Sequence, residues 1–208
     1  MKLYLVRHGE SEGNKGRMHQ TDATVLSSSG LLQAQKVAKR FAHTPVDLII
    51  ASTTTRTRQT ANEIHKLLKC PIEFDEKLKE QKGPAEVLGK SWEDAKVLEV
   101  WEKINKNHHN PNYHTSDEEN NWDFIHRIST ALESIAQKPQ ESIMIVTHGY
   151  VIRAITGLVL LGPEFTSRQF QYMKKASFAK NTGVTVCEYT TEHGWVLDTY
   201  NDHAHLLE

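Results

Sequence analysis

The chain has 208 residues, a formal net charge of −1 and 38% hydrophobic residues, so we expect residues 1–208 to form a single domain around one core. Because the charge is close to zero, no global field recruits nucleic acid or an anionic membrane, and any anion site must be built locally. No apolar stretch approaches the roughly 20 residues of a membrane span, and Arg7 comes too early for a signal peptide, which predicts a cytoplasmic protein.

The first predicted element is a buried strand, Leu3–Val6, which ends at Arg7, His8 and Gly9. Four consecutive apolar residues are too few for a core helix and too continuous for an exposed strand. Open α/β sheets bind ligands beyond the carboxyl ends of their strands, and a glycine there allows a sharp turn or a close approach. On its own, however, an Arg-His pair after a strand is more often an ordinary surface feature.

The polar, aperiodic segment from Ser11 to Ser29 is predicted to be a loop over the end of this strand. A helix follows, with apolar residues at helical spacing over Leu31–Phe41 and with Ser28 or Ser29 as its N-cap. Loops on a rigid scaffold often carry binding groups, so this loop is a candidate wall of a site.

A second buried strand, Val46–Ala51, leads into a helix that Thr54 or Thr55 caps, and Arg56 falls in the first turn of that helix. A helix N-terminus favours anions through its free amides and its dipole, and an arginine adds a bidentate donor. Although an isolated arginine is usually solvated, this position favours anion binding by Arg56. Arg58, two residues later, is interpreted as structural or peripheral.

The middle of the chain is predicted to contain a short strand at Pro71–Phe74 and a helix at Trp92–Asn105. A further helix opens within Asp117–Asn121, and His126 and Arg127 flank its apolar stripe as structural residues. We interpret that stripe as core, and it comprises Trp122, Ile125, Ile128, Leu132 and Ile135.

Three histidines, His108, His109 and His114, lie between these two helices. They have no strict ligand spacing and lie in a polar stretch, so we interpret them as part of a solvent-exposed loop. The cysteines, Cys70 and Cys187, are far apart in the sequence and are interpreted as small core residues of a protein in a reducing compartment.

A second stretch has the same pattern as the first, because the buried strand Ser142–Thr147 is followed directly by His148 and Gly149. Two strands of one sheet that each end in His-Gly would bring two imidazoles together at one edge. An apolar helix follows and ends at Gly162-Pro163.

The last part of the chain is predicted to be irregular over Phe165–Lys180, with Lys174 and Lys175 in a surface patch. Strands at Asn181–Tyr189 and Trp195–Tyr200 are expected to form an antiparallel edge. The final Leu207-Glu208 could be a remnant of cloning and carries no weight.

The two His-Gly stretches and two further motifs resemble the histidine phosphatase superfamily, also called the phosphoglycerate mutase-like family. The motifs follow the family's order from end to end of the chain: Arg7-His8-Gly9-Glu10-Ser11-Glu12-Gly13-Asn14, Ser52-Thr53-Thr54-Thr55-Arg56-Thr57-Arg58-Gln59-Thr60-Ala61, Leu78-Lys79-Glu80 and Thr147-His148-Gly149. With the predicted elements, the resemblance implies an α/β fold, a three-layer α/β/α sandwich around a mostly parallel sheet with an antiparallel edge strand.

The resemblance implies a metal-independent phosphatase that acts through a phosphohistidine. His8 would attack phosphorus, and a neutral imidazole is a competent nucleophile with an unperturbed pKa of about 6.5. We expect one ring nitrogen of His8 to be fixed by a backbone carbonyl. Glu80 would protonate the leaving alcohol, although among neighbouring lysines its simplest interpretation is a solvated charge. No metal ion or cofactor is expected.

The remaining site residues are implied by the same resemblance. Catalytic charge would come from Arg7, Arg56 and His148, and phosphate or substrate binding would involve Arg7, Asn14, Arg17, Gln20, Arg56, His148 and Gly149. The expected partner is a small phosphorylated substrate, and the oligomeric state is left open.

Two alternatives to a small-metabolite phosphatase stay open. A phosphoglycerate mutase would return the phosphoryl group to a bound intermediate, but Gly13 precedes Asn14 where mutases typically carry tryptophan. A non-catalytic phospholigand-binding module would keep the arginines and lose the nucleophile or the acid. The match is weakest over Gln81–Asn121, which we interpret as a substrate-side insertion that reads the alcohol half of the substrate.

Overall fold

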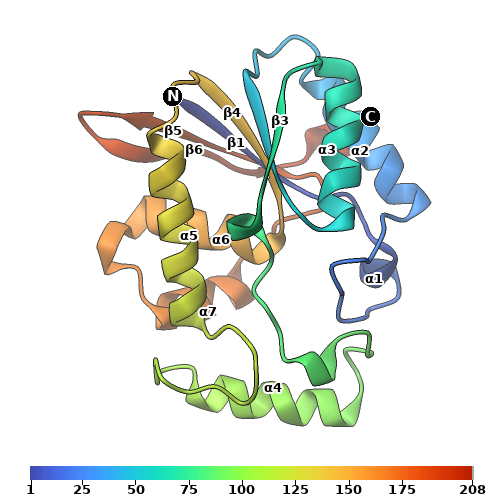
Figure 1. Ribbon diagram of the computed structural model, residues 1–208, viewed down its shortest axis with the longest axis vertical. Helices are drawn as coiled ribbons and strands as arrows, with labels where there is room; N and C mark the ends of the chain where they lie inside the picture. The colour runs from blue at the N-terminus through green and yellow to red at the C-terminus, as the bar shows by residue number, and fades with distance from the viewer. Residues whose placement is uncertain (208) are drawn as a thin grey trace.

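A computed structural model describes residues 1–207 and is shown in Figure 1. Its strands are β1 (Lys2–Arg7), β2 (Leu48–Ser52), β3 (Ile72–Asp75), β4 (Ser142–Thr147), β5 (Val184–Thr190) and β6 (Gly194–Asp202). Its α-helices are α1 (Glu12–Lys15), α2 (Ser28–Arg40), α3 (Thr55–Leu68), α4 (Ala95–Asn107), α5 (Asn121–Ala136), α6 (Gly149–Leu161) and α7 (Ser167–Ala176). The expectation about Leu207-Glu208 falls partly outside the described residues, since Glu208 is not among them.

The strands form one sheet in the order β3-β2-β4-β1-β5-β6. The four strands from β3 to β1 run parallel, and β5 pairs antiparallel with both β1 and β6. The predicted α/β fold with a mostly parallel sheet and an antiparallel edge is therefore confirmed. Because β1 and β4 are parallel neighbours in which Arg7 pairs with Thr147, the two His-Gly turns leave the sheet side by side.

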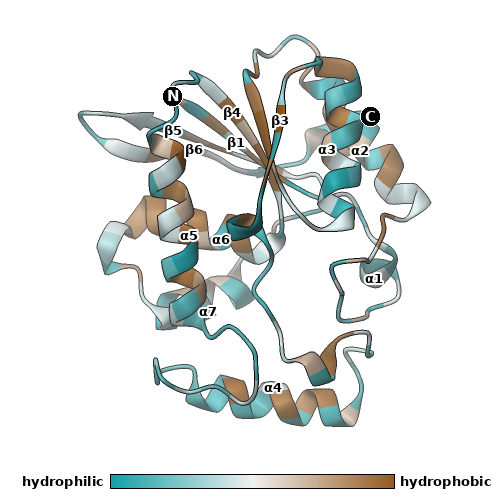
Figure 2. Cartoon of the chain, viewed as in Figure 1, coloured by the Kyte–Doolittle hydropathy of each residue, from teal (hydrophilic) through white to brown (hydrophobic). Residues whose placement is uncertain are grey.

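Helices cover both faces of the sheet, which makes the fold three-layered (Figure 1). Side chains alternate along β1, so that Leu3 and Leu5 pack into the core beneath α5 and α6, whereas Tyr4 and Val6 pack beneath α2 and α3. Figure 2 shows the resulting hydrophobic strands at the centre of the molecule. Burial on both faces explains why these strands read as continuous apolar runs.

Several local predictions were wrong. The segment Phe165–Lys180, expected to be irregular, contains helix α7, which begins with a capping box between Thr166 and Gln169. The polar loop after β1 contains the single helical turn α1. Helix α2 is capped by Ser27, one residue before the predicted cap, and Trp122 is 39% exposed although it belongs to the predicted core stripe.

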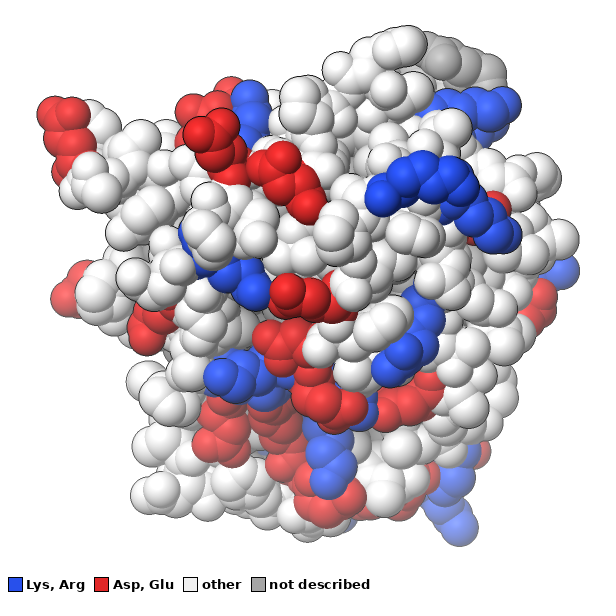
Figure 3. Space-filling model, turned by 45° about the horizontal axis from the view of Figure 1, so that its top comes forward, with Lys and Arg blue, Asp and Glu red and all other residues white. Residues whose placement is uncertain are grey.

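Other expectations agree with the structure. Cys70 and Cys187 are buried free thiols. None of the helices formed by residues 1–207 is long and apolar enough to cross a membrane. On the face shown in Figure 3, acidic and basic side chains are interspersed, as expected for a net charge near zero.

Candidate active site

A large cavity of about 1120 Å³ opens where the parallel strands end. It contains eight of the nine residues that the sequence singles out for catalysis or binding: Arg7, His8, Asn14, Gln20, Arg56, Glu80, His148 and Gly149. They come from four separate stretches that follow β1, β2, β3 and β4. The parallel sheet is therefore what brings these motifs together.

His8 directly follows β1 and is 3% exposed. Its Nδ1 lies 2.7 Å from the carbonyl oxygen of Gly9, the backbone contact that the sequence analysis expects. Because a carbonyl only accepts hydrogen bonds, Nδ1 carries the proton of the neutral ring and the lone pair lies on Nε2. Burial lowers the pKa of His8 well below its usual value, and the charges of Arg56 and Arg7 lower it further. His8 is therefore neutral at physiological pH.

The turn after β1 has room for this histidine only because the next residue is glycine. A Cβ on Gly9 would lie 2.3 Å from the carbonyl oxygen of Gly30 in α2, a distance that no side chain tolerates. The Gly9 amide donates to the Thr60 hydroxyl across 3.1 Å, which ties the turn to α3. The packing of the turn against α2 and α3 fixes the His8 backbone.

His148 follows β4, is fully buried and lies with its ring centroid 5.2 Å from that of His8. Its Nδ1 is 3.3 Å from Nη2 of Arg56, and its Nε2 is 3.0 Å from the Ser52 hydroxyl. A guanidinium only donates, so Nδ1 accepts and Nε2–H donates to Ser52. Burial lowers the pKa of His148 well below its usual value, and the charge of Arg56 adds to this effect. His148 is therefore also neutral before an anion arrives.

Arg7 and Arg56 each retain a buried donor. Arg7 donates through Nη1 to the carbonyl of Ala179 across 2.6 Å, and Arg56 through Nη1 to the carbonyl of Thr21 across 2.9 Å. The Nε atom of each arginine is buried and has no acceptor among residues 1–207. Burial lowers the pKa of Arg7 to about 10, while the charge of Glu80 opposes the shift. Buried donors without acceptors are costly, so this pair of arginines is suited to an anion with several oxygens.

Glu80 is held at the N-terminus of α6. Its Oε2 accepts from the amide of Tyr150 and its Oε1 from the amide of Gln81, each across 3.1 Å. The Thr147 hydroxyl donates to the carbonyl of Leu78 across 2.7 Å, so the end of β4 also fixes the chain that leads to Glu80. A carboxylate that accepts from a helix N-terminus is in a favourable place electrostatically.

Arg127 supports the same segment from α5. Its Nη1 donates to the carbonyls of Lys77 and Lys79, and its Nε and Nη2 donate to the carboxylate of Glu119. These contacts fit the structural interpretation of Arg127 made from the sequence. Because Arg127 also lines the cavity, it forms part of the wall behind Glu80.

Asn14 and Gln20 belong to one hydrogen-bond network around Ser11. The Ser11 hydroxyl is 3.0 Å from Asn14 Oδ1 and 2.8 Å from Gln20 Oε1. Asn181, which the sequence analysis does not single out, donates to the carbonyl of His8 across 3.0 Å and lies 3.3 Å from Asn14 Oδ1. The network joins the loop after β1 to the chain before β5 and orders both around His8.

Arg17 is the one predicted binding residue that does not line the cavity. Its side chain is exposed, pairs with Glu93 across 3.2 Å and lies over the ring of Trp92. Its carbonyl accepts from the amide of Trp92 across 2.9 Å. Arg17 thus joins the loop after β1 to residues 89–93, and its guanidinium is directed to that contact.

The cavity wall also contains residues that the sequence did not point to, among them Tyr150, Arg153 and Lys174. Arg153 is 8% exposed and donates to the carbonyl of Ser177 through Nε and Nη2. An arginine one turn into an otherwise apolar helix is a signal that the sequence offers. Lys174 was assigned to a surface patch because α7 was not predicted, and the structure corrects this assignment.

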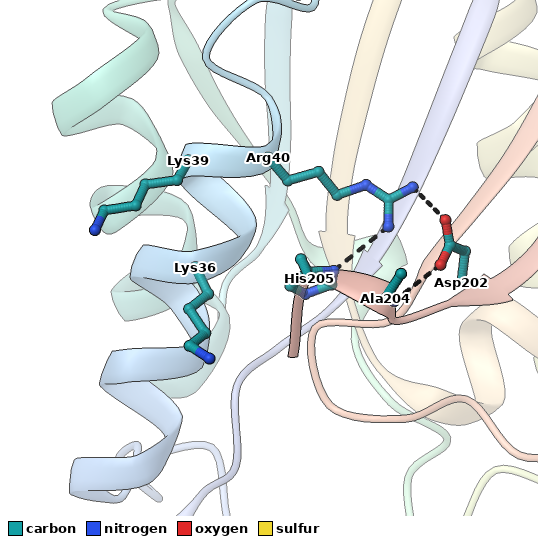
Figure 4. Close-up of a pocket in the computed structure, with 6 residues that line it drawn as sticks. All are labelled: Lys36, Lys39, Arg40, Asp202, Ala204 and His205. Carbon is teal, nitrogen blue, oxygen red and sulfur yellow. Dashed lines mark hydrogen bonds and ion pairs between the residues drawn. The ribbon is translucent and has the colours of Figure 1, made fainter. Parts of the chain in front are cut away.

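A second cavity, of about 430 Å³, lies between α2 and the C-terminal residues (Figure 4). Arg40 pairs there with Asp202 across 2.6 Å, and one of its nitrogens lies 3.4 Å from Nδ1 of His205. Burial lowers the pKa of His205 to about 4, with the charge of Arg40 contributing. None of the candidate catalytic residues lines this cavity.

The histidines between α4 and α5 do not gather. His114 is exposed and pairs with Asp123 across 2.9 Å, while Nδ1 of His108 lies 2.6 Å from the carbonyl of Asn105. Within residues 1–207, no group of three or more His, Cys, Asp or Glu side chains is arranged to hold a metal ion.

Comparisons with known proteins agree with this geometry. The model of the histidine phosphatase superfamily (branch 1) matches residues 3–203. A probable phosphoglycerate mutase, GpmB, of Proteus mirabilis is 28% identical to this chain. The alignment covers 100% of this chain and 96% of the relative. YhfR of Bacillus stearothermophilus superposes with a TM-score of 0.81 at 25% identity, over 99% of this chain and 98% of that one.

A phosphoserine phosphatase of Entamoeba histolytica, solved in complex with 3-phosphoglyceric acid, superposes with a TM-score of 0.78 at 24% identity. The superposition covers 99% of this chain and 98% of that one. At this identity the likeness shows the shared fold alone.

Proposed function

We propose that this chain, which belongs to the histidine phosphatase superfamily (branch 1), hydrolyses phosphate monoesters of small metabolites through a phosphohistidine on His8. The observation that carries the proposal is the meeting of two largely buried arginines, Arg7 and Arg56, with a neutral His8 in one cavity. A phosphoryl group bears its charge on several oxygens, so it supplies acceptors to both arginines while its phosphorus faces the histidine.

In the first step, Nε2 of His8 attacks phosphorus and the bond from phosphorus to the ester oxygen breaks. Nδ1–H keeps its hydrogen bond to the carbonyl of Gly9, which stabilises the charge that forms on the ring. Glu80, protonated once the anionic phosphoryl group is bound beside it, gives that proton to the departing oxygen, so the alcohol leaves neutral. Arg7 and Arg56 stabilise the charge on the transferring group.

In the second step, water attacks the phosphohistidine in line with the bond from phosphorus to Nε2. Glu80, now ionised, accepts a proton from that water. The bond to His8 breaks, phosphate leaves and the histidine returns to its neutral form. His148 takes up a proton when the anion binds, because the anion offsets the charges that keep the ring neutral beforehand. The protonated ring then donates a hydrogen bond to the phosphoryl oxygens during both steps.

A phosphoglycerate mutase is the second candidate, and it is favoured by the name of the Proteus mirabilis relative. A mutase uses the same first step but must hold the intermediate until the phosphoryl group returns to it. The cavity is about 1120 Å³ and opens to solvent, which leaves room for water beside the phosphohistidine. This supports hydrolysis.

The proposal is tested by phosphate release from small phosphomonoesters in excess chelator, with His8→Ala beside the wild type. Hydrolysis predicts phosphate release that survives chelation and disappears in the variant. For 3-phosphoglycerate, a mutase instead predicts isomerisation that needs a bisphosphate primer and conserves total ester phosphate. Binding of phosphate by a wild type that catalyses neither reaction would point to the non-catalytic module.

A further inference from the structure

The cavity contains a second cationic centre on the α6 and α7 wall. Lys174 extends from α7, and its ammonium lies 4.6 Å from the ring centroid of Phe170 and 4.9 Å from that of Tyr150. Tyr150 is also the residue whose amide holds Glu80. The ammonium is thus on the side of Glu80, the proposed proton donor to the leaving alcohol, where the alcohol half of a substrate would lie.

The hydrogen bonds of Lys174 go to neutral groups. Its Nζ donates to Oε1 of Gln81 and to Oδ1 of Asn121, each across 2.8 Å. Lys79 and Lys82, which line the same cavity, instead form ion pairs with Asp22, Glu76 and Asp117. Within residues 1–207, Lys174 has no carboxylate at ion-pair distance. An ammonium has three N–H donors, so the protonated side chain keeps one donor for a ligand.

The two amides are held in place from behind. Gln81 donates through Nε2 to the carbonyl of Glu119 across 2.9 Å, and Asn121 donates through Nδ2 to the hydroxyl of Ser167 across 3.1 Å. With their NH₂ groups occupied, both amides present oxygens to Lys174. The lysine is therefore positioned before any ligand binds, which lowers the entropic cost of binding.

The surroundings of Lys174 disfavour an uncompensated charge. Burial lowers the pKa of Lys174 to about 7, and the charge of Arg153 lowers it further, while Glu80 opposes the shift. A partly buried cation in such a place gains from an anion brought by a ligand. A single ammonium beside two amide oxygens is better suited to bind a singly charged anion than a phosphate. A phosphate is bound more readily by the paired N–H groups of arginine.

We propose that Lys174 binds a carboxylate on the alcohol half of the substrate, so that the enzyme prefers phosphorylated hydroxy acids and amino acids. The inference rests on the proposed function and adds the substrate class. Lys174 then determines specificity: the arginines and His148 bind the phosphoryl group, and Lys174 binds the second anion of the same molecule.

The test compares 3-phosphoglycerate with glycerol 3-phosphate, which has a neutral hydroxymethyl group in place of the carboxylate. Lys174→Met keeps the length and the apolar contacts of the side chain and removes its charge. We expect it to lower kcat/KM for 3-phosphoglycerate by about 10- to 100-fold, because a charge-assisted hydrogen bond is lost, and to leave glycerol 3-phosphate within about threefold. Lys174→Arg, which keeps the charge, should retain most of the preference.

Arg168→Met is the matched control, because Arg168 is exposed on the same helix and does not line the cavity. An equal loss in Arg168→Met would mean a general charge effect and would overturn the inference. Equal kcat/KM values of the wild type for the two substrates would overturn it as well, while leaving the proposed hydrolysis intact.

If the wild type releases phosphate from neither compound, the inference is decided by calorimetric binding of both compounds to His8→Ala. Tighter binding of 3-phosphoglycerate that Lys174→Met abolishes in that background would support the carboxylate site. Equal binding of the two compounds would overturn it, and in either case the proposed hydrolysis of these substrates would have failed separately.

Discussion

Arg56 donates to Nδ1 of His148 across 3.3 Å, so an N–H of a permanent cation lies where a second proton on the imidazole would lie. The hydroxyl of Ser52 accepts from the other ring nitrogen. This arrangement keeps His148 neutral and leaves Arg56 partly engaged with it. An arriving anion attracts the guanidinium and at the same time offsets the charge that opposes protonation of the ring.

The first prediction is that anion binding takes up protons. Inorganic sulfate is a suitable probe, since it stays a dianion across the pH range of interest. The pKa of His148 is lowered in the free protein, and a bound dianion raises it, so we expect proton uptake at pH values between the free and the bound pKa. Calorimetry in two buffers of different ionisation enthalpy measures the uptake. The number of protons taken up on sulfate binding should be smaller in His148→Gln. Zero uptake by the wild type would contradict the link between anion binding and protonation of His148.

Substitution of Glu80 should have an effect that depends on the leaving group. An alkyl alcohol needs a proton as it leaves, so Glu80→Gln should lower kcat/KM for an alkyl phosphate by about 10²- to 10⁴-fold. A nitrophenolate leaves without a proton, so the first step with nitrophenyl phosphate should fall much less. Glu76→Gln, which changes a neighbouring exposed carboxylate, is the control. Equal losses for both substrates would refute the acid role.

Arg56→Lys should weaken the site even though the charge is kept. Arg56 is 4% exposed and uses separate nitrogens for Thr21 and His148, with Nε still buried and without an acceptor. A lysine cannot reproduce this fork, so we expect kcat/KM to fall by about 10- to 100-fold. Arg58→Lys changes an exposed arginine on the same helix and should have little effect. Similar losses in both variants would contradict the assignment.

Stability should decrease as the pH falls from 7 to 5. His205 has a pKa lowered to about 4 in the folded protein, against about 6.5 when unfolded, so the unfolded chain binds more protons in this interval. Protonation therefore favours unfolding, by up to about 2 kcal/mol at pH 5 for this residue. His205→Gln should reduce the pH dependence of the free energy of unfolding by that amount in urea denaturation. An unchanged dependence would show that His205 does not contribute.

The centre of the site was predictable from the sequence because it rests on local patterns. Two apolar runs that each end in His-Gly identify β1 and β4, and parallel pairing of buried strands places His8 beside His148. Arg56 was located by the same logic, since it starts a helix at the end of β2. These features depend on a few consecutive residues and on one general property of parallel sheets.

The outer wall of the site was not predictable in the same way. Lys174 lies in helix α7, which its polar sequence did not predict. Its partners Gln81 and Asn121 are 93 and 53 residues away in the chain. Asn181 reaches His8 only because β5 folds back against β1. Such contacts are set by the packing of distant segments, which hydrophobic periodicity does not encode.

Trapping the intermediate shows whether the phosphoryl group passes through His8. Wild-type protein and Glu80→Gln are mixed rapidly with a nitrophenyl phosphate, quenched in alkali to preserve phosphohistidine, and mapped by peptide mass. Phosphate should be found on the peptide that contains His8, should form as fast as nitrophenolate, and should persist longer in Glu80→Gln. Phosphate release without a phosphorylated His8, or with the phosphoryl group on another residue, would rule out His8 as the nucleophile.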